Sequence, residues 1–327
     1  MFARIVLKMI VAAVAFSVCG GVPAQSAEQR YPVKAIRLIS PFAPGGGAST
    51  VARMIGPELT EAWGQSVVVD NRPGAGGSIG TELAARSPAD GYTLLMATAS
   101  TIVINPLVSK VPFDPVRDFT PVIHTTTVPL VLVVHPSVPA KSVKELLAHA
   151  AHGRLNFASS GEGTTSHLAA ELFKGLGNVT MTHVPYKGGG QAIIDLMAGH
   201  VQTGFVNILE ALPQVNAGRL RALAVSTSKR SPVAASIPTV SEAGVGGYEV
   251  IQWSGVLAPA GMPKAITIRL NEQINRILNG VDMRTRLMDS GADPGGGSPE
   301  QFSALIQSEI AKWSKVVKSV KLDGLTR

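Results

Sequence analysis

The chain has 327 residues, of which 45% are hydrophobic and 16% are charged, so it is long enough to bury one large core or two smaller ones. Its formal net charge is +7, and the lysines and arginines are spread along the sequence without a basic cluster or interleaved aromatic residues. This pattern argues against nucleic-acid binding, and the weakly positive field would suit a small anion.

The first 27 residues have the pattern of a secretory signal peptide. Arg4 and Lys8 flank the start of an apolar run, and small residues follow near positions 24–27, where cleavage is expected. Two alternatives stay open: a membrane anchor, for which the run is short, and a lipoprotein anchored at Cys19, which a bulky residue precedes. Cys19 is the only cysteine, so the cleaved protein would have neither disulfides nor thiol chemistry. We expect an exported, periplasmic protein.

From residue 31 onward, apolar β-branched stretches alternate with amphipathic ones, which predicts an α/β protein. Strands are expected at residues 35–40, 66–71, 92–98, 119–136 and 248–261, and within the segments 155–177, 179–200, 201–218 and 220–227. Helices are expected after the glycine-rich loops and at residues 142–152, 263–279, 281–291 and 298–320. Ser49 or Thr50 is expected to cap the first helix, and Ser142 a later one.

Two unusually long extended stretches, residues 119–136 and 248–261, bracket the middle of the chain. Each is expected to carry the chain from one lobe to another. We therefore predict a first lobe made of residues 31–126 and 252–327, and a second lobe made of residues 127–251. One continuous α/β domain is the alternative that the pattern leaves open.

Four loops rich in glycine, serine and threonine stand where a predicted strand meets a predicted helix. They read APGGGAST, NRPGAGGSIG, ASSGEGTTSH and PYKGGGQA, at residues 43–50, 71–80, 158–167 and 185–192. A helix N-terminus presents unpaired N–H groups and a partial positive charge, and glycine lets a ligand come close to them. Any one loop can be a simple tight turn, but four together favour an anion-binding site.

Nucleotides and catalysis are less well supported. No G-x-x-x-x-G-K-[ST] pattern occurs, and in the segment that begins at Gly74 and Gly76, Ile79 replaces the last glycine of G-x-G-x-x-G. Residues 76–80 match the G-x-S-x-G nucleophile elbow around Ser78, yet several residues separate this serine from the preceding strand. The sequence predicts no catalytic residue, no metal and no cofactor.

Several ordered motifs resemble one known family. The segments PFAPGGG, VVVDNRPGAGGSIG, ADGYTLLMAT, GTTSHLAAELF, HVPYKGGGQAIIDLMAGHV and GRLRALAVSTSKRSP are similar to the solute receptors of tripartite tricarboxylate transporters, the TctC-like or Bug family. The resemblance runs from about residue 31 to the C-terminus. It implies a periplasmic-binding-protein-like (type II) Venus-flytrap fold, with two α/β lobes and a ligand cleft, that captures a small carboxylate through backbone amides, hydroxyls and ordered waters.

Carried over position by position, the resemblance places ligand contacts on both walls of the cleft. The first lobe would contribute Phe42, Ala43, Pro44, Gly45, Gly46, Gly47, Ser49 and Ser100. The second lobe would contribute Ser159, Ser160, Gly163, Thr164, Thr165, His167, Tyr186, Lys187, Gly188, Val206 and Asn207.

The chain departs from the family's pattern at two of these positions. Ser49 stands where the family often has the acid of GGGTD, and Val206 stands where it often has the acid of FDN. Losing both acids removes possible partners for an ammonium group. We therefore expect a ligand that is an acid without an amino group, with apolar bulk beside Val206.

These features predict a monomeric receptor, not an enzyme, that binds a small carboxylate and delivers it to the membrane permease subunits of a tripartite tricarboxylate transporter. Two other functions stay open at this point. One is a secreted serine hydrolase that uses Ser78 or a histidine, and the other is a ligand-sensing receptor that docks on a signalling partner.

Overall fold

The computed structural model describes residues 31–153 and 155–319. The predicted signal peptide at residues 1–27 lies outside the described residues. Within the described ranges, no helix combines the length and the apolar character that a membrane crossing needs.

The strands form one mixed sheet of ten members. They are β1 (Ile36–Ser40), β2 (Val67–Asn71), β3 (Thr93–Thr98), β4 (Phe119–Val134), β5 (Asn156–Ser159), β6 (Thr182–Pro185), β7 (Thr203–Asn207), β8 (Arg221–Val225), β9 (Ile251–Pro259) and β10 (Asp293–Gly296). The helices are α2 (Gly47–Trp63), α3 (Ser78–Ala85), α4 (Asn105–Val108), α5 (Val143–His152), α6 (Thr165–Gly177), α7 (Gly189–Met197), α8 (Ile208–Asn216), α9 (Lys264–Asn279), α10 (Val281–Asp289) and α11 (Pro299–Ser319).

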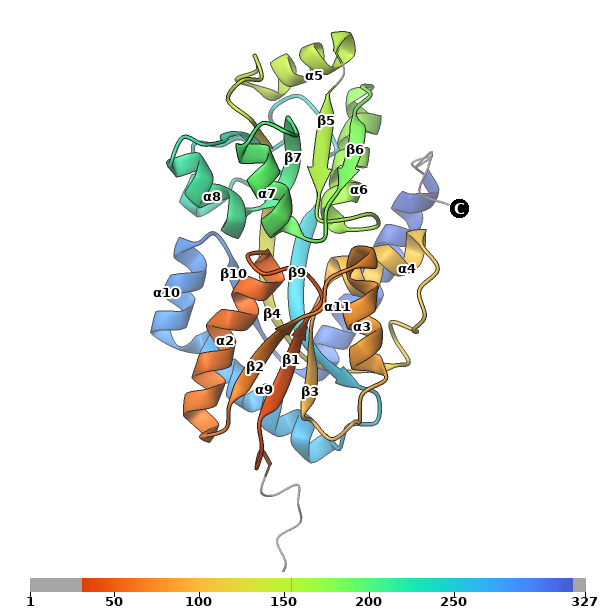
Figure 1. Cartoon of the computed structure of the whole chain (residues 1–327), viewed down its shortest axis with the longest axis vertical. Helices are drawn as coiled ribbons and strands as arrows, with labels where there is room; N and C mark the ends of the chain where they lie inside the picture. The colour runs from red at the N-terminus through yellow and green to blue at the C-terminus, as the bar shows by residue number, and fades with distance from the viewer. Residues whose placement is uncertain (1–30, 154, 320–327) are drawn as a thin grey trace, which may run out of the picture.

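The first lobe is built on β1, β2 and β3, which pair in parallel, with β9 antiparallel to β3 and β10 antiparallel to β4. Helices α2, α3 and α9 lie around these strands in the lower half of Figure 1. Their apolar faces, such as Val51, Ile55 and Leu59 of α2, are buried against the sheet. The predicted α/β architecture is confirmed in this lobe, and its first three strands are parallel.

The second lobe is built on β5, β6 and β7, which pair in parallel, with β7 and β8 both antiparallel to β4. Helices α5 to α8 surround these strands in the upper half of Figure 1. Ser142 caps α5 as predicted, since its side chain accepts a hydrogen bond from the Glu145 N–H at 3.2 Å.

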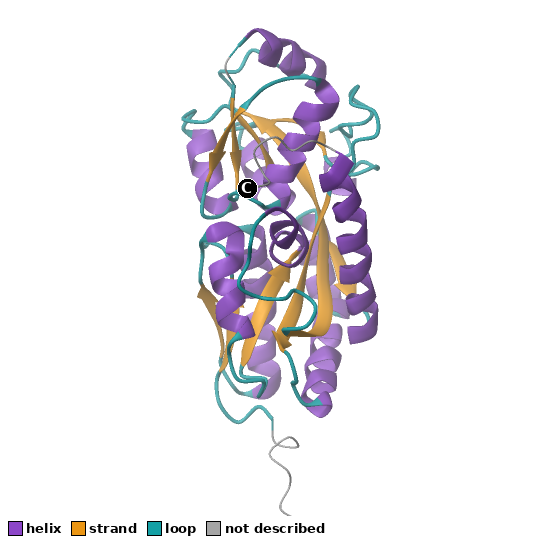
Figure 2. Cartoon of the chain, turned by 90° about the vertical axis from the view of Figure 1, so that its right-hand side faces the viewer, coloured by secondary structure: helices purple, strands orange, loops and turns teal. Residues whose placement is uncertain are grey.

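Two long strands join the lobes. The first part of β4, up to Pro129, pairs with β9, whereas Leu130 to Val134 pair with β7 in the second lobe. Figure 2 shows the sheet continuing from one half of the molecule into the other. The two-lobe α/β architecture is therefore confirmed, while the exact division at residues 126 and 251 stays a prediction.

The predicted cap of the first helix was wrong. Helix α2 already begins at Gly47, and its N-cap is Gly46, which offers no side chain. Ser49 accepts a hydrogen bond from the Asn71 side chain, and Thr50 donates one back to the Gly46 carbonyl at 3.2 Å. The first N–H groups of this helix are thus left for partners other than a capping hydroxyl.

Candidate functional site

The four glycine-rich loops meet between the two lobes. The Ala43 N–H of the first lobe donates to the Lys187 carbonyl of the second at 3.2 Å. A methyl group on Gly161, in the second lobe, would lie 3.6 Å from the Cα atom of Gly76 in the first. The convergence expected from the sequence is therefore present, and the loops touch one another across the seam.

Two glycines show why side chains are excluded from this seam. Gly188 has φ +145°, and a Cβ atom there would lie 3.0 Å from the Ala43 nitrogen. A Cβ atom on Gly47 would lie 2.5 Å from Nδ2 of Asn207. Because both clashes are between lobes, glycine at these places permits the lobes to close.

A small cavity lies between the closed lobes. Its volume is about 20 Å³, roughly the room that one water molecule needs. The lining residues come from both lobes: Phe42, Gly46, Gly47, Ala48, Ser100, Ser160, Ser166, Gly189, Asn207, Glu210 and Gln252. Since an organic acid is much larger than this cavity, it can enter only if the lobes move apart.

Four helices begin at this seam: α2, α6, α7 and α8. Neither α2 nor α7 has a side-chain cap, since glycine precedes each of them. Thr164 caps α6, and Asn207 caps α8 by accepting the Leu209 N–H at 3.0 Å. The positive ends of these helices and the uncapped N–H groups make the seam favourable for an anion.

Ser100 and Thr165 link the lobes directly. The Thr165 N–H, which is the first of α6, donates to Ser100 Oγ at 2.9 Å, and the two hydroxyl oxygens lie 2.9 Å apart. Both side chains are buried. Ser100 therefore holds the second lobe at the N-terminus of α6.

Glu210 is the site residue that the sequence reasoning missed. It lies in the first turn of α8 and reaches across the seam, where Oε1 accepts a hydrogen bond from the Gly47 N–H at 2.5 Å. The residue is only 9% exposed, and Oε2 has no hydrogen-bond partner. Burial raises the pKa of this carboxyl to about 8, although the Gly47 N–H lowers it. The local signal, a glutamate three residues after an N-cap asparagine, predicts a capping box on α8 and not a contact across the seam.

Among the described residues, three buried side-chain atoms lack a hydrogen-bond partner: Ser40 Oγ, Glu210 Oε2 and Trp253 Nε1. Trp253 lines a second small cavity, of about 10 Å³, which shares Gly47 and Asn207 with the first and continues toward β4 and β9. Two of the three unpaired atoms therefore belong to residues that line the space between the lobes.

His167 lies behind the cleft wall and does not line the cavity. Its ring stacks on His183 with 3.7 Å between centroids, and Nδ1 accepts the Gly163 N–H at 3.2 Å. Burial lowers the pKa of His167 to about 3 and that of His183 to about 4. Ser159 bonds to the His183 ring at 2.6 Å. These residues hold the shape of the second-lobe loop.

The other predicted contacts are distributed unevenly. Phe42, Gly46, Gly47, Ser100, Ser160 and Asn207 line the cavity. Beside it, Pro44, Gly45 and Lys187 are exposed, while the Tyr186 hydroxyl donates to Asp195 at 2.7 Å. Val206 does not line the cavity: it pairs with Val131 in the sheet and packs in the apolar core. All of them stay predictions as ligand contacts.

Ser78 does not have the geometry of a nucleophile elbow. Strand β2 ends at Asn71, and a short turn separates it from Ser78, the first residue of α3. Ser78 Oγ accepts a hydrogen bond from the Asn105 side chain at 2.9 Å. Within residues 31–153 and 155–319, no histidine or carboxylate is hydrogen-bonded to this hydroxyl.

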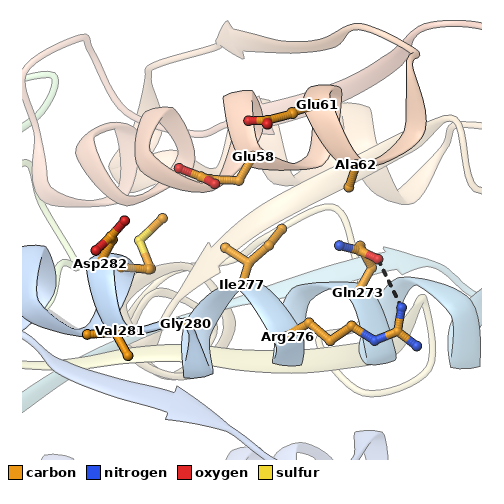
Figure 3. A pocket seen from close by; sticks show the side chains of 10 residues that line it. Glu58, Glu61, Ala62, Gln273, Arg276, Ile277, Gly280, Val281 and Asp282 are labelled. Carbon is orange, nitrogen blue, oxygen red and sulfur yellow. Dashed lines mark hydrogen bonds between the residues drawn. The ribbon is translucent and has the colours of Figure 1, made fainter.

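A larger hollow lies on the surface of the first lobe, between α2 and the pair α9 and α10 (Figure 3). Its volume is about 470 Å³, and Glu58, Glu61, Arg276 and Asp282 line it. It contains none of the glycine loops and involves one lobe only, so it does not share the features that make the seam a candidate anion site.

The comparisons with known proteins show the family to which the chain belongs. A sequence profile described as "Tripartite tricarboxylate transporter family receptor" matches residues 51–322. Protein BugT of Bordetella pertussis is 36% identical over 307 residues, which cover 93% of this chain and 94% of BugT.

Two solved structures are also similar. Rpa4515 of R. palustris, solved with adipate, has a TM-score of 0.87 and 40% identity, covering 89% of this chain and 98% of that one. MatC of Rhodopseudomonas palustris, solved with malate, has a TM-score of 0.83 and 34% identity, covering 88% and 100%. The chain therefore belongs to the family of tripartite tricarboxylate transporter receptors, the TctC-like or Bug solute-binding proteins.

Proposed function

We propose that this protein captures a small organic carboxylate between its lobes and delivers it, without catalysis, to the permease subunits of a tripartite tricarboxylate transporter. The ligand carboxylate is bound by backbone N–H groups at the uncapped starts of α2 and α7, with hydroxyls and ordered waters completing the contacts. The protein acts in the periplasm as a monomer, after removal of its signal peptide.

One observation carries this proposal: uncapped helix N-termini from both lobes face a common cavity. A site made of N–H groups recognises a carboxylate by charge and shape, and it needs no charged side chain. The site spans two lobes joined by long strands, so a ligand held by both would favour the closed form.

The identity of the acid is proposed from chemistry. Two relatives of this chain were solved with dicarboxylates, adipate and malate. Glu210 is the one acid among the described residues that line the cavity, and its burial favours the uncharged form, which offers no negative charge to an ammonium group. We therefore expect a carboxylic acid without an amino group to bind in preference to aspartate or glutamate.

Isothermal titration of the mature protein against adipate, malate, aspartate and glutamate tests the proposal. The expected result is saturable one-to-one binding of a plain dicarboxylate, at least tenfold tighter than binding of either amino acid. Tight binding of aspartate or glutamate alone would overturn the ligand preference. Binding of none of these acids, together with turnover of an ester, would overturn the receptor function.

A further inference from the structure

Glu210 places a carboxyl group in the same space that the proposed ligand carboxylate must enter. The carboxyl lies between the starts of two helices, since Oε1 accepts the Gly47 N–H of α2 and a side chain on Gly189 of α7 would collide with Oε2. Oε2 faces no hydrogen-bond partner in the protein. A buried polar atom without a partner costs free energy, which a bound ligand can recover.

We propose that Glu210 is a ligand-contacting side chain, in which Oε2 carries a proton and donates it in a hydrogen bond to a carboxylate oxygen of the bound acid. This inference rests on the proposed function, and it adds a side chain that distinguishes ligands by their charge. While Oε2 donates to the ligand, Oε1 continues to accept the Gly47 N–H.

Within the part of the chain that the structure describes, no cationic side chain that would favour an ionised Glu210 lines the cavity. Around the cavity, α2 presents Gly47, α7 presents Gly189 and α6 presents Ser166, and none of these titrates. Ser100, just after β3, and Gln252 of β9 are also uncharged. Lys187, in the loop before α7, has an exposed side chain. Glu210 is the one titratable side chain among the described residues that line this cavity.

A carboxylate ligand would strengthen the preference for a protonated Glu210. Two negative carboxylates in contact within a buried space repel each other, so one of the two must hold a proton. Burial already raises the pKa of Glu210 to about 8. An ammonium group would instead need an ionised Glu210, and the positive ends of the surrounding helices oppose that ligand. Binding of the acid is therefore coupled to a proton on Glu210.

The experiment is isothermal titration with adipate and malate at pH 7, 8 and 9, in paired buffers of different ionisation enthalpy. The wild-type protein is expected to bind at least tenfold more weakly at pH 9 than at pH 7 and to take up about one proton per ligand at pH 9. Glu210→Gln keeps an amide donor at this position but cannot titrate, so its affinity is expected to be the same at all three pH values. Circular dichroism confirms that each variant is folded.

Glu61→Gln is the matched control, because Glu61 is an exposed glutamate on α2, and it should retain the wild-type pH profile. A wild-type affinity that does not change with pH, or a Glu210→Gln profile identical to that of the wild type, would overturn the role of Glu210 and leave the receptor function intact. If the wild type bound amino acids and Glu210→Gln did not, the role of Glu210 as a proton donor would also be overturned, because Glu210 would then act as an anion. Absence of binding in every protein at every pH would refute the proposed function itself, and this inference with it.

Discussion

At the residue scale, the seam is held by hydrogen bonds such as Gly47 with Glu210 and Thr165 with Ser100, which join residues far apart in the sequence. Runs of glycine at strand-to-helix turns indicate a backbone that another group approaches closely. The loops around Gly46 and Gly188 could therefore be predicted from the sequence. The partner of Glu210 is Gly47, 163 positions away in the sequence. No local pattern reports such a pairing, and Glu210 therefore appeared only in the structure.

The placement of Val206 bears on its predicted contact with the ligand. Its neighbour Asn207 lines the cavity, but side chains alternate between the two faces of a strand. Val206 therefore points into the core of the second lobe, and the expected apolar contact with the ligand has no support in its placement. Ser49 and Val206 are not acids, but the cavity between the lobes still has a carboxyl group, that of Glu210.

His167 and His183 should make the free energy of unfolding depend on pH. Their pKa values are lowered to about 3 and about 4 by burial, whereas unfolded histidine titrates near 6.5. The unfolded chain therefore binds more protons as the pH falls below about 6.5. Each histidine should lower the free energy of unfolding by about 1.4 kcal/mol per pH unit below that value, and this loss ends near the folded pKa.

Urea unfolding between pH 5 and pH 7 measures this effect. His167→Asn is expected to lower the slope of stability against pH by up to about 1.4 kcal/mol per pH unit, whereas His200→Asn, which changes an exposed histidine, should keep the wild-type slope. Equal slopes for the wild type and His167→Asn would show that the stacked pair does not remain neutral in the folded protein.

At the element scale, periodic segments were predictable and irregular ones were not. The long strand β4 and helix α5 appear where the apolar pattern placed them. Strand β10 reads DPGG, a sequence that disfavours strands. It forms because it can pair with the free edge of β4 near His124 and Thr126, so tertiary pairing overrides its local preference.

The start of α7 offers a test of closure. A methyl group on Gly190 would lie 2.5 Å from the Pro44 carbonyl oxygen and 3.0 Å from the Gly45 carbonyl carbon, both in the other lobe. Gly190→Ala should therefore hinder closure while each lobe keeps its fold. We expect the affinity for the preferred dicarboxylate to fall at least tenfold, with little change in the thermal unfolding midpoint.

Gly246→Ala serves as the control for that variant, because a methyl group at Gly246 would meet no atom within 4 Å. Its affinity should equal that of the wild type. If Gly190→Ala bound the acid as tightly as Gly246→Ala does, the loops could not be in contact when the ligand is held.

At the scale of the whole molecule, the two-lobe plan followed from two long extended segments that bracket the middle of the chain. Their length made a crossing between lobes the simplest interpretation, and β4 does serve both halves of the sheet. How far the lobes close could not be predicted, because closure depends on contacts such as Ser100 with Thr165, which join distant parts of the chain.

The central claim is that helix N-termini from both lobes bind one carboxylate of a small acid. A crystal structure of the protein with its preferred dicarboxylate tests this most directly. The account predicts that one carboxylate accepts N–H hydrogen bonds from the first turn of α2, beyond the Gly47 N–H that Glu210 holds, and from a helix of the second lobe, with Glu210 in contact. An acid bound to one lobe only, or in the hollow between α2 and α9, would contradict it.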